Sequence, residues 1–143
     1  MSTFNEKVAI VTGAATGIGY GISKRLSSEN TKIIMVDFDG NMAEQSSSEL
    51  IAKGGDIEVV IGDVSLPETA EAAVKTAVDK WGHVDILVNN AGIGGINGNI
   101  WELEVEELDR VYRTNLRGVF TFCNKTIPTM LENNYGRIVN IAS

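Results

Sequence analysis

Short apolar runs alternate with segments of helical periodicity along the whole chain. Five runs are rich in Val and Ile and too short for helices, at residues 8–11, 33–36, 57–61, 86–88 and 138–141. Nearly all are continuous rather than alternating, which is typical of parallel strands covered on both faces. Strands that alternate with helices through right-handed crossovers predict an α/β fold, a Rossmann-type doubly wound parallel sheet with strand order 3-2-1-4-5.

Two of the intervening segments have a clear apolar face. Ser65 and Glu68 have capping-box spacing, and the helix that they open carries apolar residues at helical spacing as far as Trp81. A longer helical segment spans about residues 104–133, and Pro128 is expected to kink or break it near its end. Its apolar stripe comprises Leu108, Val111, Tyr112, Leu116, Val119, Phe120, Cys123 and Ile127.

The length fits one domain over residues 1–143, long enough to bury a core without disulfides or metal. With 43% apolar and 22% charged residues the composition is globular. The sequence stops at Ser143, directly after the fifth predicted strand, with no helix to cover that strand. Complete proteins avoid an open apolar edge strand, so we expect this chain to be truncated after strand five.

The net charge of −7 is spread along the chain, which argues against nucleic-acid or anionic-membrane partners because both need a positive field. No apolar run approaches the ~20 residues of a membrane span, and no targeting segment opens the chain. One cysteine, Cys123, cannot form an internal disulfide. A cytoplasmic protein is therefore expected, and with one His and one Cys no metal site is predicted.

A glycine-rich loop follows the first strand and leads directly into a helix. Its sequence is Thr-Gly-Ala-Ala-Thr-Gly-Ile-Gly over residues 12–19. Gly13 allows the tight turn, Gly17 lets the backbone approach a pyrophosphate, and Gly19 lets the helix pack closely on the sheet. The amides of the first helical turn favour negative charge, so the loop predicts a dinucleotide site that also includes Thr16 and Ile18.

Asp37 ends the second strand 18 residues after Gly19, close to the ~20 expected for a carboxylate that binds the adenosine ribose. Its charge would repel a 2′-phosphate by up to ~4 kcal/mol at about 4 Å and an effective dielectric of 20. No Arg or Lys stands at residues 14–18 or 38–40 to offset that repulsion. The sequence therefore favours NAD over NADP as the cofactor.

Four further signals follow in order: Asp63-Val64 after the third strand, Asn-Asn-Ala-Gly at residues 89–92 after the fourth, Asn115 in the long helical segment, and Ser143 after the fifth. Together with the Thr-Gly-x₃-Gly-x-Gly loop, the chain resembles the classical short-chain dehydrogenase/reductase family over residues 7–143, essentially its whole length.

The resemblance implies roles for these residues. Asp63 would contact the adenine with Val64 beside the ring, while Asn90, Ala91 and Gly92 would support the sheet and border a cofactor ribose. Ser143 would orient the carbonyl or hydroxyl of an alcohol or ketone substrate, and Asn115 would hold a water in the proton relay. From the residues alone, Asn115 lies on the apolar stripe and is expected to point inward, where hydrogen bonding would also explain it.

The family's acid/base Tyr, with a Lys four residues later, would lie about a dozen residues beyond Ser143. Tyr20 and Lys24 have this spacing, but they lie on the first helix and short patterns often match by chance. We therefore expect residues 1–143 alone to bind dinucleotide weakly and to turn over no substrate.

Three alternatives to an NAD-dependent alcohol/ketone oxidoreductase remain. An NADPH-dependent 3-oxoacyl-carrier-protein reductase shares the motifs, although Asp37 speaks against NADPH. A non-catalytic dinucleotide-binding remnant would fit a chain that ends naturally at Ser143, and an FMN-binding flavodoxin-like domain is disfavoured by the glycine pattern. The resemblance also implies that the full-length protein is a homo-oligomer, a dimer or tetramer, formed by the helix that carries Phe120, Cys123 and Ile127 together with a helix after the fifth strand.

Overall fold

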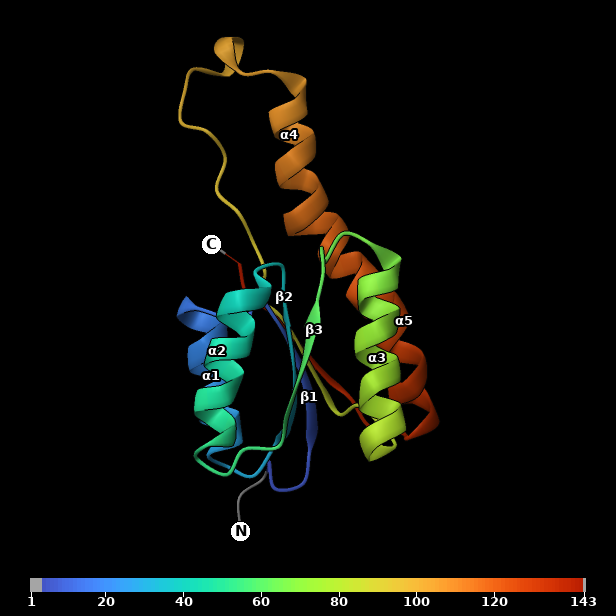
Figure 1. The fold of residues 1–143 in the computed structure, drawn as a ribbon. Helices are drawn as coiled ribbons and strands as arrows, with labels where there is room; N and C mark the ends of the chain where they lie inside the picture. The colour runs from blue at the N-terminus through green and yellow to red at the C-terminus, as the bar shows by residue number, and fades with distance from the viewer. Residues whose placement is uncertain (1–3, 143) are drawn as a thin grey trace.

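The computed structural model describes residues 4–142 and contains a five-stranded parallel sheet between two layers of helices (Figure 1). The strands are β1 (Val8–Thr12), β2 (Lys32–Asp37), β3 (Ile57–Ile61), β4 (Ile86–Asn89) and β5 (Arg137–Asn140). Their order is β3-β2-β1-β4-β5, so the predicted fold class and strand order are confirmed.

The inner strands β1, β2 and β4 are buried on both faces, as continuous apolar strands require, whereas the edge strand β5 is exposed along its length. One face packs against α1 (Gly17–Ser27) and α2 (Gly40–Ile51), and the other packs against α3 (Pro67–Trp81) and α5 (Gly118–Glu132). Alternate residues of β1 divide between the two cores: Ile10 belongs to the α3/α5 side with Phe122, and Val11 to the α1/α2 side with Leu50.

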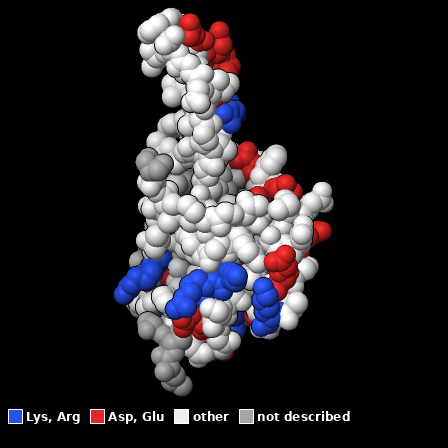
Figure 2. Space-filling view, turned by 90° about the vertical axis from the view of Figure 1, so that its left-hand side faces the viewer, with Lys and Arg blue, Asp and Glu red and all other residues white. Residues whose placement is uncertain are grey.

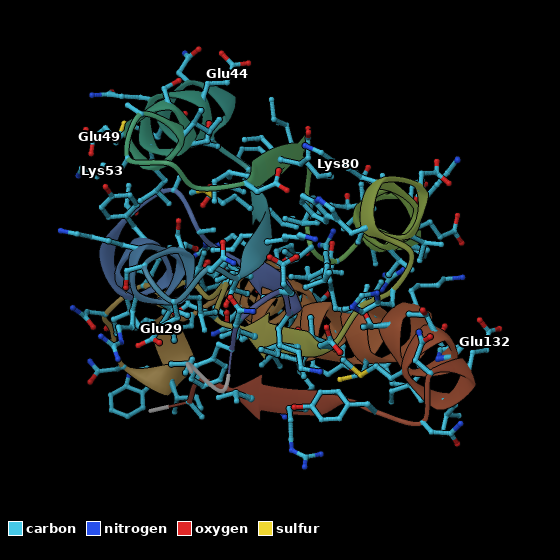
Figure 3. All side chains as sticks on the ribbon, turned by 90° about the horizontal axis from the view of Figure 1, so that it is seen from below. Glu29, Glu44, Glu49, Lys53, Lys80 and Glu132 are labelled. Atoms are coloured by element: carbon cyan, nitrogen blue, oxygen red, sulfur yellow. The ribbon has the colours of Figure 1, made fainter. Side chains whose placement is uncertain are left out.

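Charged side chains lie on the outside of both helical layers. Seen from below, Glu44, Glu49 and Lys53 point outward from the α2 side, and Glu132 points outward at the end of α5 (Figure 3). Among residues 4–142, no helix is long and apolar enough to cross a membrane.

Two details of α3 and α5 differ from the sequence prediction. The capping box of Ser65 and Glu68 does not form, because α3 begins at Pro67 and the N–H of Ser65 is bound by the Asp63 carboxylate at 2.8 Å. Pro128 lies inside α5, and the helix continues past it to Glu132, so it does not break the helix.

The long helical segment is continuous from Val105 to Glu132, as predicted, but a π-helical turn divides it. After a 3₁₀ turn, η1 (Ile100–Glu102), come α4 (Val105–Tyr112), a π-helical turn η2 (Arg113–Arg117) and then α5. The loop after β4, η1 and α4 form an arm that projects beyond the carboxyl ends of the strands (Figures 1 and 2). Because α4 and η2 lie beyond the sheet, the stripe residues Leu108, Tyr112 and Leu116 are exposed. Phe120 is exposed as well, on the part of α5 that faces away from the sheet.

Candidate dinucleotide-binding site

A cleft of about 630 Å³ opens at the carboxyl ends of the strands, where ligands bind in parallel sheets. Most of the predicted cofactor-binding residues line it. The lining residues are Gly13, Thr16, Gly17, Ile18, Asp37, Phe38, Gly62, Asp63, Val64, Asn90, Ala91, Gly92, Ile93, Arg110 and Thr114.

The glycine loop forms the floor of this cleft between β1 and α1. Gly13 and Gly17 have φ values of +61° and +55°, a left-handed conformation that favours glycine. A methyl group on Gly17 would meet no atom within 4 Å, so the start of α1 stands open to the cleft. An anion can therefore approach the first-turn amides of α1 without steric obstruction.

Gly19 belongs to the support of the loop rather than to the cleft lining. A methyl group there would lie 2.0 Å from the carbonyl oxygen of Gly13 and 2.6 Å from Asn90 Nδ2. Only glycine permits this contact between α1 and the loop, in keeping with the close packing that the sequence predicts.

Asn90 ties the loop after β4 to the end of β1. Its Nδ2 donates to the carbonyl oxygens of Thr12 and Gly13 at 3.0 and 3.1 Å. The Thr12 hydroxyl oxygen in turn accepts from the N–H groups of Asn90 and Ala91, both at 3.0 Å. These four bonds fix the glycine loop against the wall of the cleft formed by residues 90–92.

Asp37 stands at the end of β2 with both carboxylate oxygens hydrogen-bonded to backbone. Oδ2 accepts from the N–H of Ala15 at 2.9 Å, and Oδ1 accepts from the N–H of Asp39 at 3.1 Å. The carboxylate therefore has a fixed position at the cleft edge. Beside it, Phe38 is 80% exposed and also lines the cleft.

Asp63 and Val64 line the cleft beyond β3. The Asp63 carboxylate accepts from Ser65, which orders the turn into α3. Val64 is buried, and a methyl group on Gly118 would lie 2.8 Å from Val64 Cγ2. The start of α5 thus holds Val64 in place from behind.

Asn115 is exposed, which corrects the expectation that it points inward. It lies in η2, beyond the sheet edge, where the stripe has no core to face. Its Oδ1 accepts from the N–H of Ile93 at 2.8 Å, and its Nδ2 donates to the carbonyl oxygen of Ile93 at 2.9 Å. The amide therefore holds the loop after β4 and does not itself line the cleft.

The sequence interpretation missed Arg110 and its partner Glu107. Arg110 lines the cleft and forms a two-bond ion pair with Glu107, with Nε and Nη2 each 2.8 Å from a carboxylate oxygen. The Arg110 guanidinium, followed by the N–H of Ile96, lowers the pKa of Glu107 to about 2. The i,i+3 spacing of opposite charges was the available signal.

Tyr20 is not placed for acid/base chemistry at the cleft. Its hydroxyl donates to Glu49 on α2 at 2.8 Å, and this bond raises the pKa of Tyr20. Ser143 lies outside the described residues. Among residues 4–142, no group of three or more His, Cys, Asp or Glu side chains could hold a metal ion.

Comparisons with known proteins agree with this architecture. The family model for short chain dehydrogenase matches residues 7–143. The chain is 40% identical over 138 residues to 2-dehydro-3-deoxy-L-rhamnonate dehydrogenase (NAD(+)) of Sphingomonas sp. (strain SKA58), covering 96% of this chain and 53% of that protein. It thus spans about half the length of the curated relatives it matches.

Two crystal structures have closely similar folds. A short chain dehydrogenase/reductase from Burkholderia phymatum in complex with NAD matches with a TM-score of 0.95 and 33% identity, covering 100% of this chain and 51% of that one. A 3-ketoacyl-(acyl-carrier-protein) reductase from Brucella melitensis complexed with NADH matches with a TM-score of 0.91 and 40% identity, covering 99% and 58%.

Proposed function

This chain belongs to the short-chain dehydrogenase family, and on that premise we propose that it binds NAD(H) for hydride transfer between a secondary alcohol and a ketone. The observation that carries the proposal is the cleft. It joins the glycine loop, the Asp37 carboxylate and the Asn90–Gly92 segment at the carboxyl edge of a parallel sheet.

The described residues fit a dinucleotide. A pyrophosphate would lie at the open start of α1 near Thr16, Gly17 and Ile18, with the adenosine ribose toward Asp37. Asp63 and Val64 would border the adenine, and residues 90–92 would border the half of the cofactor nearest β4 and β5. When bound, the nicotinamide would supply the hydride chemistry.

NAD is the proposed cofactor because of the charge at the ribose end. Asp37 is fixed there by two backbone N–H groups. Arg110, the one Lys or Arg among the cleft-lining residues, is paired with Glu107 and so does not stand free to bind a 2′-phosphate. The Sphingomonas relative named above carries NAD(+) in its name, which supports the same choice.

Ser143 is proposed to orient the substrate, and Asn115 to serve the reacting centre through its hold on Ile93. A polypeptide of residues 1–143 alone is expected to show no alcohol oxidation. Its Tyr20–Lys24 pair lies on α1 with the tyrosine hydroxyl turned to Glu49, and no other Tyr-x-x-x-Lys pair occurs in these residues.

A second candidate is a 3-oxoacyl-carrier-protein reductase, favoured by the 40% identity to the Brucella reductase. Because that reductase is complexed with NADH, binding of NADH by this chain would fit both candidates, whereas a preference for NADPH would favour the reductase. A non-catalytic dinucleotide-binding module is the third, and the intact mass of the natural product would distinguish it, since a longer chain with a Tyr-x-x-x-Lys pair restores the enzyme.

We also propose a cytoplasmic homo-oligomer. Large apolar side chains are exposed along one continuous stretch of α4, η2 and α5, and a second copy would cover them; they include Val105, Leu108, Tyr112, Leu116 and Phe120. Sedimentation analysis of the full-length protein tests this, with a dimer or tetramer expected and a monomer at all concentrations contradicting it.

Binding can be tested directly by titrating the chain with NADH and following the fluorescence of the reduced nicotinamide. Gly17→Ala should weaken binding by about tenfold or more, because it places a methyl group on the open side of the loop and an alanine at a φ of +55°, which favours glycine. Gly21→Ala is the matched control: Gly21 lies in α1, a methyl group there meets nothing within 4 Å, and binding should be unchanged. No NADH binding by the unchanged chain would contradict the proposal.

A further inference from the structure

The glycine-rich loop after β4 is bound through its backbone by side chains of α4. Glu107 Oε1 accepts from the N–H of Ile96 at 2.7 Å, and Arg110 Nη2 donates to the carbonyl oxygen of Gly94 at 3.0 Å. Asn115 binds both backbone groups of Ile93, the first residue of this loop. Residues 93–96 are therefore anchored at three successive points.

Glu107 and Arg110 hold each other while they hold the loop. The two-bond geometry between guanidinium and carboxylate fixes both side chains, and Glu107 retains only 13% exposure of its side chain. With its pKa lowered to about 2, the Glu107 carboxylate remains charged throughout the physiological range of pH. Throughout this pH range, Glu107 can therefore accept from the N–H of Ile96 while Arg110 donates to the carbonyl oxygen of Gly94.

The loop itself has little else to define its shape. It contains Gly94, Gly95 and Gly98, it forms no helix or strand, and most of it is exposed. Glycine loses more conformational freedom on ordering than any other residue, so such a loop needs anchors to keep one conformation. Its first residue, Ile93, lines the cleft together with Arg110.

We propose that Glu107 and Arg110 are positioning residues, which fix the loop at residues 93–96 and thereby set the wall of the dinucleotide cleft on its β4 side. This inference rests on the proposed function, since the wall matters only if a dinucleotide occupies the cleft. The Asp37 side of the cleft is fixed separately, by the contacts of Asp37 with Ala15 and Asp39. Loss of the pair should therefore disturb one half of the site.

Three variants separate this role from that of an ordinary helix ion pair. Glu107→Gln removes the charge that holds the guanidinium. Glu106→Gln makes the same change on the neighbouring residue, whose side chain forms no hydrogen bond or ion pair within residues 4–142. The double variant Glu107→Arg with Arg110→Glu restores an ion pair, but it presents a donor to the Ile96 N–H and an acceptor to the Gly94 carbonyl.

Two readouts are needed: the Kd for NADH, and hydrogen exchange of the Ile96 amide, with Tm measured for every variant. Glu107→Gln and the double variant should both expose the Ile96 amide to faster exchange and weaken NADH binding about five- to tenfold. Glu106→Gln should match the unchanged chain in both readouts. Recovery of NADH affinity in the double variant would assign the pair a helix-stabilising role only and overturn the inference.

The two proposals fail in different ways. If the unchanged chain binds NADH and Glu107→Gln exposes Ile96 without weakening binding, the positioning role is wrong while the proposed function stands. If the unchanged chain binds no NADH, the proposed function is wrong. The positioning role is then wrong as well, even if slow hydrogen exchange of the Ile96 amide shows that the loop is anchored.

Discussion

The carboxylate of Asp37 accepts a hydrogen bond from the backbone N–H of Ala15, 22 residues earlier in the chain, at 2.9 Å. This contact joins the end of β2 to the middle of the glycine loop. The group that would bind the adenosine ribose and the loop that would bind the pyrophosphate are therefore held as one unit, so the charge at the ribose end cannot swing away from a 2′-phosphate.

Replacing Asp37 should change cofactor preference. In Asp37→Asn the negative charge is lost, while one oxygen remains to accept from Ala15. We expect the affinity for NADPH to rise relative to that for NADH by about tenfold, because the repulsion of the 2′-phosphate is removed. Competition titrations with both cofactors measure the ratio.

Asp39→Asn is the control for this prediction. Asp39 does not line the cleft and caps α2 by accepting from the N–H of Met42, a role that Asn fills equally well. The two variants have the same net charge. An equal change of the cofactor ratio in both would mean that overall charge, rather than the position of Asp37, sets the preference.

Gly19→Ala should destabilise the fold by about 1–3 kcal/mol, because the new methyl group would lie 2.0 Å from the Gly13 carbonyl oxygen, which is backbone and cannot move freely. Gly21→Ala, two residues further along the same helix, should be neutral or stabilising by up to ~1 kcal/mol. Chemical denaturation of both variants gives the comparison, and equal stabilities would contradict the packing described for α1.

Asn90→Ala should leave the carbonyl groups of Thr12 and Gly13 without their side-chain donor. The expected loss is about 1–3 kcal/mol of stability together with weaker NADH binding, because the glycine loop is no longer tied to β4. Asn97→Ala in the exposed arm loop should change neither quantity. Urea unfolding and NADH titration of the two variants check this prediction. Unchanged stability and unchanged NADH affinity in Asn90→Ala would refute it.

The contribution of Glu107 to stability should depend on pH only in acid. Its pKa falls from 4.5 to about 2 in the folded chain, chiefly through the Arg110 guanidinium. A carboxyl group whose pKa is lower in the folded than in the unfolded chain stabilises the fold at every pH above its unfolded pKa. This stabilisation is lost as the pH falls from the unfolded pKa through the folded pKa. The difference in unfolding free energy between the unchanged chain and Glu107→Gln should therefore shrink between about pH 4.5 and pH 2, and a constant difference would speak against the pairing.

Much of the architecture could be predicted from sequence, for reasons that particular elements make clear. Residues 33–36 and 86–88 are continuous apolar runs typical of a doubly covered sheet, and right-handed crossovers with the dinucleotide-type glycine loop then favour the observed strand order. Gly13, Asp37 and Asn90 come directly after β1, at the end of β2 and directly after β4, so the fold itself brings them to one edge.

The sequence did not predict that the loop after β4, η1 and α4 form an arm beyond the sheet. The stripe of the long helical segment predicts burial, but α4 projects beyond the sheet, so Asn115 is exposed and binds Ile93 instead. The contact of Glu107 with Ile96 depends on how the loop returns along α4, which no local spacing encodes. The failed capping box has a local cause, since Pro67 starts α3 and Asp63 already binds the Ser65 N–H.

We propose that this cleft binds a dinucleotide and that Asp37 selects NAD. The most direct test is a side-by-side titration of the unchanged chain with NADH and NADPH at low salt, followed by nicotinamide fluorescence. We expect saturable binding of NADH that is at least about tenfold tighter than that of NADPH. Equal or tighter binding of NADPH would contradict it.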